Sequence, residues 1–168
     1  MIGRLMAMFR HPMWLKRAMN LYPPYLGAGV RVVEVQGEPL HTVRIRMGLH
    51  AYNRNYIGTQ FGGSLFSMAD PWCMLILIQQ LGEDYMVVDK AGAIQFRRPG
   101  KGAVHLDVHV SADRVAAIRA AVAESERGRH DETFELEIVD DEGSVVALVS
   151  KVVHVRRREP SSRSGRGA

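Results

Sequence analysis

The stretch N-Y-I-G-T-Q-F-G-G-S-L-F-S-M-A-D-P-W-C-M-L-I-L-I-Q-Q-L, from Asn55 to Leu81, decides the fold of this 168-residue chain. It begins as a polar loop, passes through the double glycine Gly62-Gly63, and continues as a long apolar segment. Between Ser64 and Leu81, 12 of the 18 residues are apolar, and they occupy every side of a helical wheel. Because a helix that is apolar all round is a buried helix, the pattern predicts a central helix enclosed by the rest of the domain.

One acidic residue, Asp70, interrupts this apolar helix two turns after it begins. A lone carboxylate is costly to bury, so we expect it to be paired, hydrated or functional. A desolvated carboxylate is also a better base at neutral pH. At the start of the helix, the backbone N–H groups of Gly62 and Gly63 have no intrahelical partner and can hold a developing negative charge. An acid and an anion-stabilising helix start therefore lie on one element.

Two neighbours of Asp70 carry further expectations. Pro71 removes a backbone N–H and crowds the carbonyl of Ser67, so the helix should kink there. Cys73 is the single cysteine and cannot form an internal disulfide. It lies inside the apolar helix, where we expect a buried, inert thiol. The absence of an internal disulfide fits a protein of the reducing cytoplasm.

The rest of the chain alternates strands and helices. Residues 2 to 21 show helical spacing with interspersed cations, Pro12 divides this segment into two helices, and Pro23-Pro24 ends it. A signal peptide is not expected in this segment, because it has neither a charge-free apolar core nor a small-residue cleavage site. A helix docked on the sheet is favoured here, with a helix lying on a membrane surface as the alternative. The longest apolar run near the central helix, Trp72 to Ile78, is far shorter than the ~20 residues of a membrane span, so no stable membrane anchor is expected.

Six segments read as strands, and one more as a helix. Alternation of apolar and polar residues indicates strands and turn residues separate them, whereas an alanine-rich segment has helical spacing and can be capped by Ser111 or Asp113. The strands are expected over Ala28–Gln36, His41–Met47, Met86–Arg98, Ala103–Val110, Thr133–Val139 and Val145–Val155, and the helix over Ser111–Ser125. A mostly antiparallel sheet with one helix apolar all round predicts an α+β fold in which six strands wrap that helix.

Charge and metal-ligand patterns disfavour two function classes, nucleic-acid binding and metal binding. The net charge of +4 equals the surplus in the tail, where residues 156 to 168 hold five arginines and one glutamate. The body is therefore close to neutral, and no nucleic-acid partner is expected. We divide the chain into an N-terminal helical segment (1–24), one domain (25–156) and a disordered basic tail (157–168). His105, Asp107 and His109 share a strand face, but a solvated face is favoured over a metal site, so no metal or cofactor is expected.

The stretch around Asp70 resembles the hot-dog fold acyl-CoA thioesterases, and more narrowly the phenylacetyl-CoA type. The resemblance rests on Asn55, on F-G-G-S-L-F-S-M-A-D from Phe61 to Asp70, and on A-I-Q-F-R-R-P-G from Ala93 to Gly100. Those enzymes carry a loop Asn, an H-G-G turn, an acid nine positions after the His, and a strand ending F-x-R-P-G. The N-terminal helix and the inserted helix near Val115 look like a less characterised branch.

The resemblance implies a role for each matching residue. Asp70 would be the catalytic acid, acting as general base or nucleophile, and Asn55 would orient water or substrate. Gly62 and Gly63 would polarise the thioester carbonyl through backbone N–H groups. Because hot-dog thioesterase sites lie between subunits, Asp70 would act with a partner's Asn55 and Gly62 in a homodimer or a dimer of dimers. Residues expected to bind the acyl-CoA substrate are Phe61, Ser64, Arg97, Arg98 and Lys101, the basic ones through phosphate oxygens.

Two departures from the family pattern leave alternatives open. Phe61 stands where the family has His, which makes the mouth of the pocket more apolar, and Pro71 follows Asp70 directly. The alternative to a thioesterase is therefore a non-catalytic protein that binds acyl-CoA or a fatty acid. A hot-dog hydratase or dehydratase would need a His beside the acid, and none of the seven His lies between Asn55 and Leu81.

Overall fold

The structure, a computed structural model, describes residues 11–158. The helix expected before residue 11 and the basic tail beyond residue 158 lie outside the described residues. Six antiparallel strands form one sheet in the order β1-β2-β4-β5-β6-β3. The strands are β1 (Val30–Gln36), β2 (Thr42–Met47), β3 (Tyr85–Phe96), β4 (Val104–His109), β5 (Arg129–Asp140) and β6 (Val145–Arg157). All six expected strands are present, and β6 includes Arg157, the first residue of the predicted tail.

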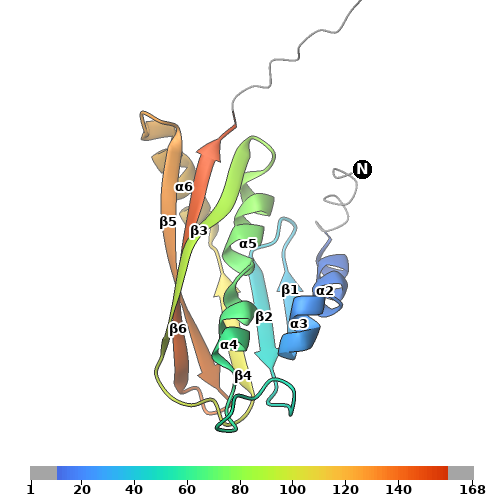
Figure 1. The fold of residues 1–168 in the computed structure, drawn as a ribbon. Helices are drawn as coiled ribbons and strands as arrows, with labels where there is room; N and C mark the ends of the chain where they lie inside the picture. Colours follow the sequence, from blue (N-terminus) through green and yellow to red (C-terminus); the bar gives the residue numbers. More distant parts are fainter. Residues whose placement is uncertain (1–10, 159–168) are drawn as a thin grey trace, which may run out of the picture.

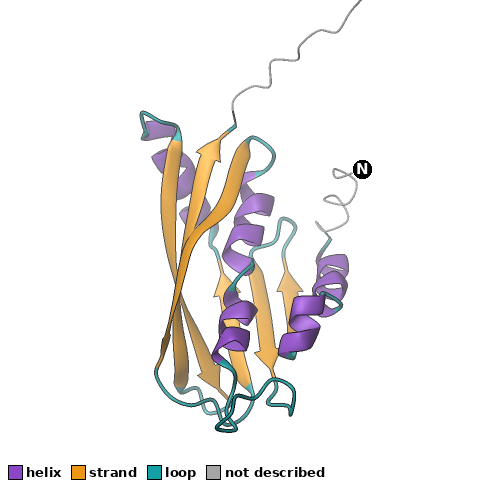
Figure 2. Ribbon diagram, in the orientation of Figure 1, coloured by secondary structure: helices purple, strands orange, loops and turns teal. Residues whose placement is uncertain are grey.

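The sheet curves around two helices that lie end to end, α4 (Gly62–Ala69) and α5 (Trp72–Leu81), as Figure 1 shows. Trp72, Cys73, Ile76 and Leu77 are fully buried between the helices and the sheet. This is the α+β hot-dog arrangement, with a sheet wrapped around a central helical segment (Figure 2). Burial of Cys73 raises the pKa of its thiol to about 12, as expected for an inert cysteine.

The central helix is two helices, not one. Asp70 and Pro71 join α4 to α5, and both keep right-handed helical dihedral angles. Pro71 has no N–H to donate to the Ser67 carbonyl, so the series of helical hydrogen bonds is interrupted there. The backbone nevertheless keeps its right-handed helical turn through both residues. The kink expected from Pro71 is therefore a break between helices, and Asp70 lies at that break.

The N-terminal segment differs from the prediction at its second proline pair. α2 (Pro12–Asn20) begins at Pro12, as expected. Pro23-Pro24 does not end the helical segment but starts α3 (Pro23–Ala28), because proline suits a first helical turn. Gly29 follows the last residue of α3 and caps the helix with a left-handed φ of 74°. β1 therefore begins at Val30 instead of Ala28.

α2 covers one edge of the sheet. Val32 of β1 donates its N–H to the side chain of Asn20 at 2.8 Å, and Asn20 Nδ2 donates to the Val32 carbonyl at 3.1 Å. A bulge between Val32 and Glu34 interrupts the same edge. Bonded side chains and bulges are devices that prevent an edge strand from pairing with another chain.

Within residues 11–158, no helix covers the opposite edge, β3, although β3 also has a bulge, between Asp89 and Ala91. β3 pairs with β6 on one side only, and its residues from Ala91 to Phe96 are mostly exposed and uncharged. A long, uncharged edge strand is a template for pairing with another strand.

The last helix, α6 (Ala112–Glu124), is capped by Ser111, whose hydroxyl accepts from the Arg114 N–H.

Within residues 11–158, no helix is both long enough and apolar enough to cross a membrane.

Candidate functional site

Asp70 is held by a buried lysine. Lys151 on β6 donates from Nζ to Oδ1 of Asp70 at 2.7 Å, and the same ammonium lies 3.2 Å from Oδ2 of Asp89 on β3. The Lys151 side chain is 3% exposed, whereas the Asp70 side chain is 52% exposed. Oδ2 of Asp70 has no hydrogen-bond partner among the described residues, so one carboxylate oxygen is fixed and the other is free.

The sheet places Lys151 beneath the helix break. Alternate residues of β6 point toward the helices, and Val149 and Val153 flank Lys151 on that buried face. Across the strand pair, Gly92 of β3 leaves room for it, because a Cβ there would lie 2.7 Å from the ring of Phe66 and 3.3 Å from Cδ of Lys151. The ammonium also lies 5.5 Å from the centroid of the Phe66 ring.

The surrounding charges favour a protonated Lys151. Burial alone would lower its pKa, but the hydrogen bond and charge of Asp70, together with Asp89, outweigh burial and raise the pKa. Burial also raises the pKa of Asp89, against the opposing effect of Lys151. Oδ1 of Asp89 is buried without a partner among the described residues. The cluster Asp70–Lys151–Asp89 is therefore a charge network centred on one buried cation.

Asp70 is paired, as one of the sequence expectations allowed, but it is not enclosed by apolar side chains. It lies at the helix break on the open side of the helices, where Phe66 and Leu75 are only partly buried. The expectation of a helix buried on every side therefore holds only for the side that faces the sheet.

A cleft of about 350 Å³ opens at the N-terminus of α4. Asn55, Gly62, Phe96, Arg97 and Arg98 are among the residues that line it. The N–H groups of Gly62 and Gly63 lie in the first turn of α4, where no helical carbonyl can accept from them. Among the described residues, neither N–H group donates to an acceptor outside the helix. The cleft therefore combines free backbone donors with two arginines.

The side chain of Asn55 forms its hydrogen bonds within its own loop. Its Oδ1 accepts from the N–H groups of Ile57 and Thr59 at 3.1 and 3.0 Å, and its Nδ2 donates to Oγ1 of Thr59 at 2.8 Å. This arrangement is an Asx-type turn, in which the side chain replaces backbone partners. Asn55 thus shapes the loop that borders the cleft, and its amide has little capacity left to orient a ligand in the single chain.

Two aromatic rings lie over the double glycine. A Cβ at Gly62 would lie 2.7 Å from the Phe96 ring, and one at Gly63 would lie 2.4 Å from the Phe61 ring. A side chain at either position would require the neighbouring ring to move aside. Phe61 and Phe96 are 55% and 58% exposed, so the rings form an apolar rim around the start of α4.

The remaining predicted residues divide into two groups. Arg97 and Arg98 line the cleft with Asn55 and Gly62, whereas Lys101 is exposed and does not line it. Ser64 is 7% exposed and lies behind the helix start, away from the cleft.

Asp70 and the double glycine are too far apart to act together within one chain. They are eight residues apart on one helical segment, which corresponds to about 12 Å at 1.5 Å per residue. A carboxylate that activates water must lie within hydrogen-bond reach of the reacting atoms. One chain therefore supplies two half-sites, an acid and a cleft.

Three polar residues of these half-sites have no strong signal in the sequence. Lys151 lies in a valine-rich strand, where a single lysine on the buried side of the alternation marks it. Asp89 lies in β3 without any motif. Gln60, 3% exposed, lines the cleft and has an unpartnered Oε1, while its Nε2 donates to the Gly102 carbonyl at 3.0 Å.

No group of three or more His, Cys, Asp or Glu side chains that could hold a metal ion occurs in the described part of the chain, which includes His105, Asp107 and His109. Each of the three has its own partner: Asp141 for His105, Arg44 for Asp107, and Thr42 for His109.

This fold is that of the thioesterase-like hot-dog proteins. The chain belongs to the family described as Domain of unknown function (DUF4442), whose profile matches residues 12–155. The comparison with functionally curated proteins found no match.

Solved structures share the fold across most of the chain. A protein of unknown function and probable thioesterase from Pseudomonas aeruginosa, PA5026, is 26% identical, with a TM-score of 0.73 over 88% of this chain and 97% of that one. A protein of unknown function from Chlorobaculum tepidum, OLEI01261, is 17% identical, with a TM-score of 0.67 over 88% and 97%. Thioesterase HI1161 from Haemophilus influenzae is 12% identical, with a TM-score of 0.61 over 91% and 95%. The last two similarities concern the fold alone.

Proposed function

We propose that this protein is a thioester hydrolase that acts on acyl-CoA or a similar acyl carrier. The observation that carries the proposal is the Asp70 carboxylate, which has one oxygen fixed by buried Lys151 and the other free on the open side of the helix break. The similarity to PA5026, a probable thioesterase, supports the same reaction class.

The complete site would form between two copies of the chain. The uncovered β3 edge is the surface that supports pairing, because the β1 edge is already covered by Asn20. Two copies joined at β3 would bring Asp70 of one subunit toward the cleft of the other, which overcomes the separation of about 12 Å along the helix.

In the proposed reaction, Asp70 accepts a proton from water as the water oxygen attacks the thioester carbonyl carbon. The carbonyl oxygen becomes negative and accepts hydrogen bonds from the Gly62 and Gly63 N–H groups at the start of α4, a contribution of roughly 3–4 kcal/mol to the barrier. The carbon–sulfur bond then breaks, and the thiolate takes up the proton and leaves as the free thiol. An attack by Asp70 itself would give a mixed anhydride, which water then hydrolyses.

The arginines at the cleft suit a carrier with phosphates. Arg97 and Arg98 are exposed, line the cleft, and have no ion pair within residues 11–158. Guanidinium groups bind phosphate oxygens through paired hydrogen bonds. The apolar rim formed by Phe61 and Phe96 would contact the thioester end of the substrate.

The alternative is a non-catalytic binder of acyl-CoA or fatty acid. The position of Phe61 favours it, since the ring lies against Gly63 and restricts access to the helix start.

A hydrolysis screen separates the two functions. Acyl-CoA substrates from acetyl-CoA to palmitoyl-CoA, with phenylacetyl-CoA, are tested for thiol release, with Asp70→Ala as the control. Buried Cys73 should not react with the thiol reagent in the folded protein. Turnover of at least one substrate that is lost in Asp70→Ala supports the hydrolase. Binding without thiol release across the series would instead assign the protein as a binder.

A further inference from the structure

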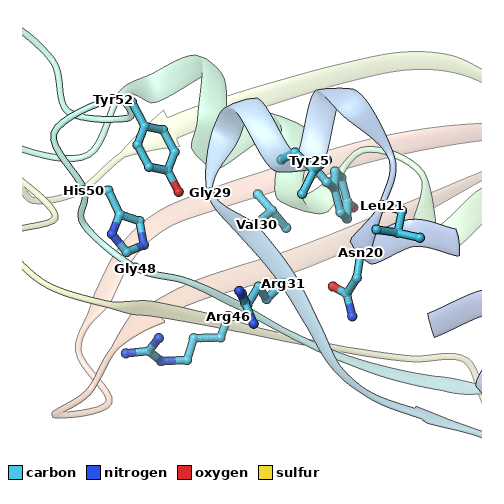
Figure 3. Close-up of a pocket in the computed structure, with 11 residues that line it drawn as sticks. Asn20, Leu21, Tyr25, Gly29, Val30, Arg31, Arg46, Gly48, His50 and Tyr52 are labelled. Atoms are coloured by element: carbon cyan, nitrogen blue, oxygen red, sulfur yellow. The ribbon is translucent and has the colours of Figure 1, made fainter. Parts of the chain in front are cut away.

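A cavity of about 610 Å³ lies away from both half-sites. It is bounded by α2, α3, the adjoining ends of β1 and β2, and the loop through His50 and Tyr52 (Figure 3). It shares no lining residue with the cleft beside Gly62. Neither the proposed hydrolysis nor the dimer uses it.

Two arginines on neighbouring strands form part of the cavity wall. Arg31 of β1 and Arg46 of β2 are register partners in the antiparallel pair, and both line the cavity. Neither forms an ion pair or a side-chain hydrogen bond within residues 11–158. Like charges directly opposite each other in a sheet repel, and no carboxylate within residues 11–158 pairs with either of these two exposed arginines.

The neighbouring arginine on the same strand shows the contrast. Arg44 lies two residues before Arg46, on the same side of β2, and is 3.0 Å from Glu34 and 3.4 Å from Asp107. No acidic residue precedes Glu34 in the sequence, so α2 and α3 bring no carboxylate to the cavity. His50 also lines the cavity, with its ring stacked on that of Tyr52 at a centroid distance of 5.2 Å.

The other wall of the cavity is apolar. Tyr25 is buried and donates its hydroxyl to the Met68 carbonyl, so it presents its ring to the cavity. Leu21 and Leu26 also line the cavity and are 72% and 53% exposed. Exposed leucines beside unpaired arginines make a surface with one cationic and one apolar part.

We propose that this cavity binds an organic oxyanion, a phosphate or carboxylate that carries an apolar chain. The guanidinium groups of Arg31 and Arg46 hold the anionic oxygens in paired hydrogen bonds. The apolar chain lies on Tyr25, Leu21 and Leu26. The same chemistry is offered by a free amphiphile and by the headgroup region of an anionic lipid bilayer.

Calorimetric titration of the full chain tests this site with decyl phosphate as the probe. Saturable binding is expected, weakened about tenfold or more in the double variant Arg31→Ala/Arg46→Ala, as for loss of charged hydrogen bonds. Arg44→Ala is the matched control and should bind as the wild type does. The double variant should remain folded because it removes a like-charge pair, and Arg46→Gln provides a second, milder variant.

Absence of saturable binding would overturn the proposal. So would an equal loss in Arg44→Ala, or binding that survives the double variant and disappears in Arg98→Ala. A vesicle sedimentation assay then identifies the source of the anion. Retention on phosphatidylglycerol vesicles, but not on phosphatidylcholine vesicles, that is lost in the double variant assigns a lipid headgroup. Decyl phosphate binding without vesicle retention assigns a free amphiphile.

Discussion

Lys151 is the residue on which the acid's position depends. A buried ammonium between Asp70 and Asp89 holds one oxygen of the catalytic candidate in a fixed direction. Lys151→Met leaves both carboxylates without their partner. We expect it to lower the free energy of unfolding by about 1–3 kcal/mol in denaturant titrations. Under the proposed function it should also lower kcat more than it changes KM.

Lys90→Met is the matched control for Lys151. Lys90 pairs with Asp131 between exposed side chains, and such a surface pair contributes at most about 1 kcal/mol. Lys151→Arg should restore part of the lost kcat, because it keeps a charge at the same place. A Lys151→Met protein with wild-type stability and wild-type kcat would show that the network has no role in positioning Asp70.

Asp131 contributes to the loss of folding stability at low pH. Hydrogen bonds from Lys90 and from His154 lower the pKa of Asp131 from 3.8 to about 2. A carboxyl group with a lowered folded pKa contributes stability above its unfolded pKa and loses it as the pH falls toward the folded value. The wild type should therefore lose more stability than Asp131→Asn between about pH 4 and pH 2. Thermal unfolding across that range would contradict this if the two proteins lost stability in parallel.

At the scale of elements, the break between α4 and α5 places Asp70. Pro71 keeps helical dihedral angles, so alanine fits there without strain and can donate to the Ser67 carbonyl. Pro71→Ala should join the two helices, keep the melting temperature at or above that of the wild type, and reduce turnover by moving Asp70 relative to Lys151. Pro24→Ala, in the first turn of α3, should leave turnover unchanged. Unchanged turnover in Pro71→Ala would mean that the break has no catalytic purpose.

Elements with a clear periodicity were predictable from sequence, and contacts between distant segments were not. Apolar–polar alternation, clearest in β2 and β4, together with the turn residues predicted the six strands, and the apolar run after Gly63 predicted the central helical segment. Pro23-Pro24 was misinterpreted because a proline pair can end one helix or start the next. Asp89 and Lys151 are 62 residues apart in the chain and meet only through the register of β3 with β6. No local pattern encodes that register.

At the scale of the whole molecule, the two sheet edges predict a dimer. β3 offers an uncharged, mostly exposed edge from Ala91 to Phe96, whereas β1 is covered by Asn20. Light scattering at micromolar concentration should give the mass of at least a dimer. Ala93→Asp, which adds a charge to the open edge, should shift the protein toward the monomer and reduce turnover. Val33→Asp at the covered edge should do neither. A monomeric wild type would rule out a site shared between subunits.

The central claim is that Asp70 activates the attack on a thioester, and the turnover of Asp70→Asn tests it most directly. The amide keeps nearly the same shape but cannot accept a proton as a carboxylate does. Because Asp70 is half exposed, the melting temperature should change little. Turnover of the preferred acyl-CoA should fall by roughly 10²–10⁴-fold. An Asp70→Asn protein that hydrolyses the same substrate at the wild-type rate would contradict the account.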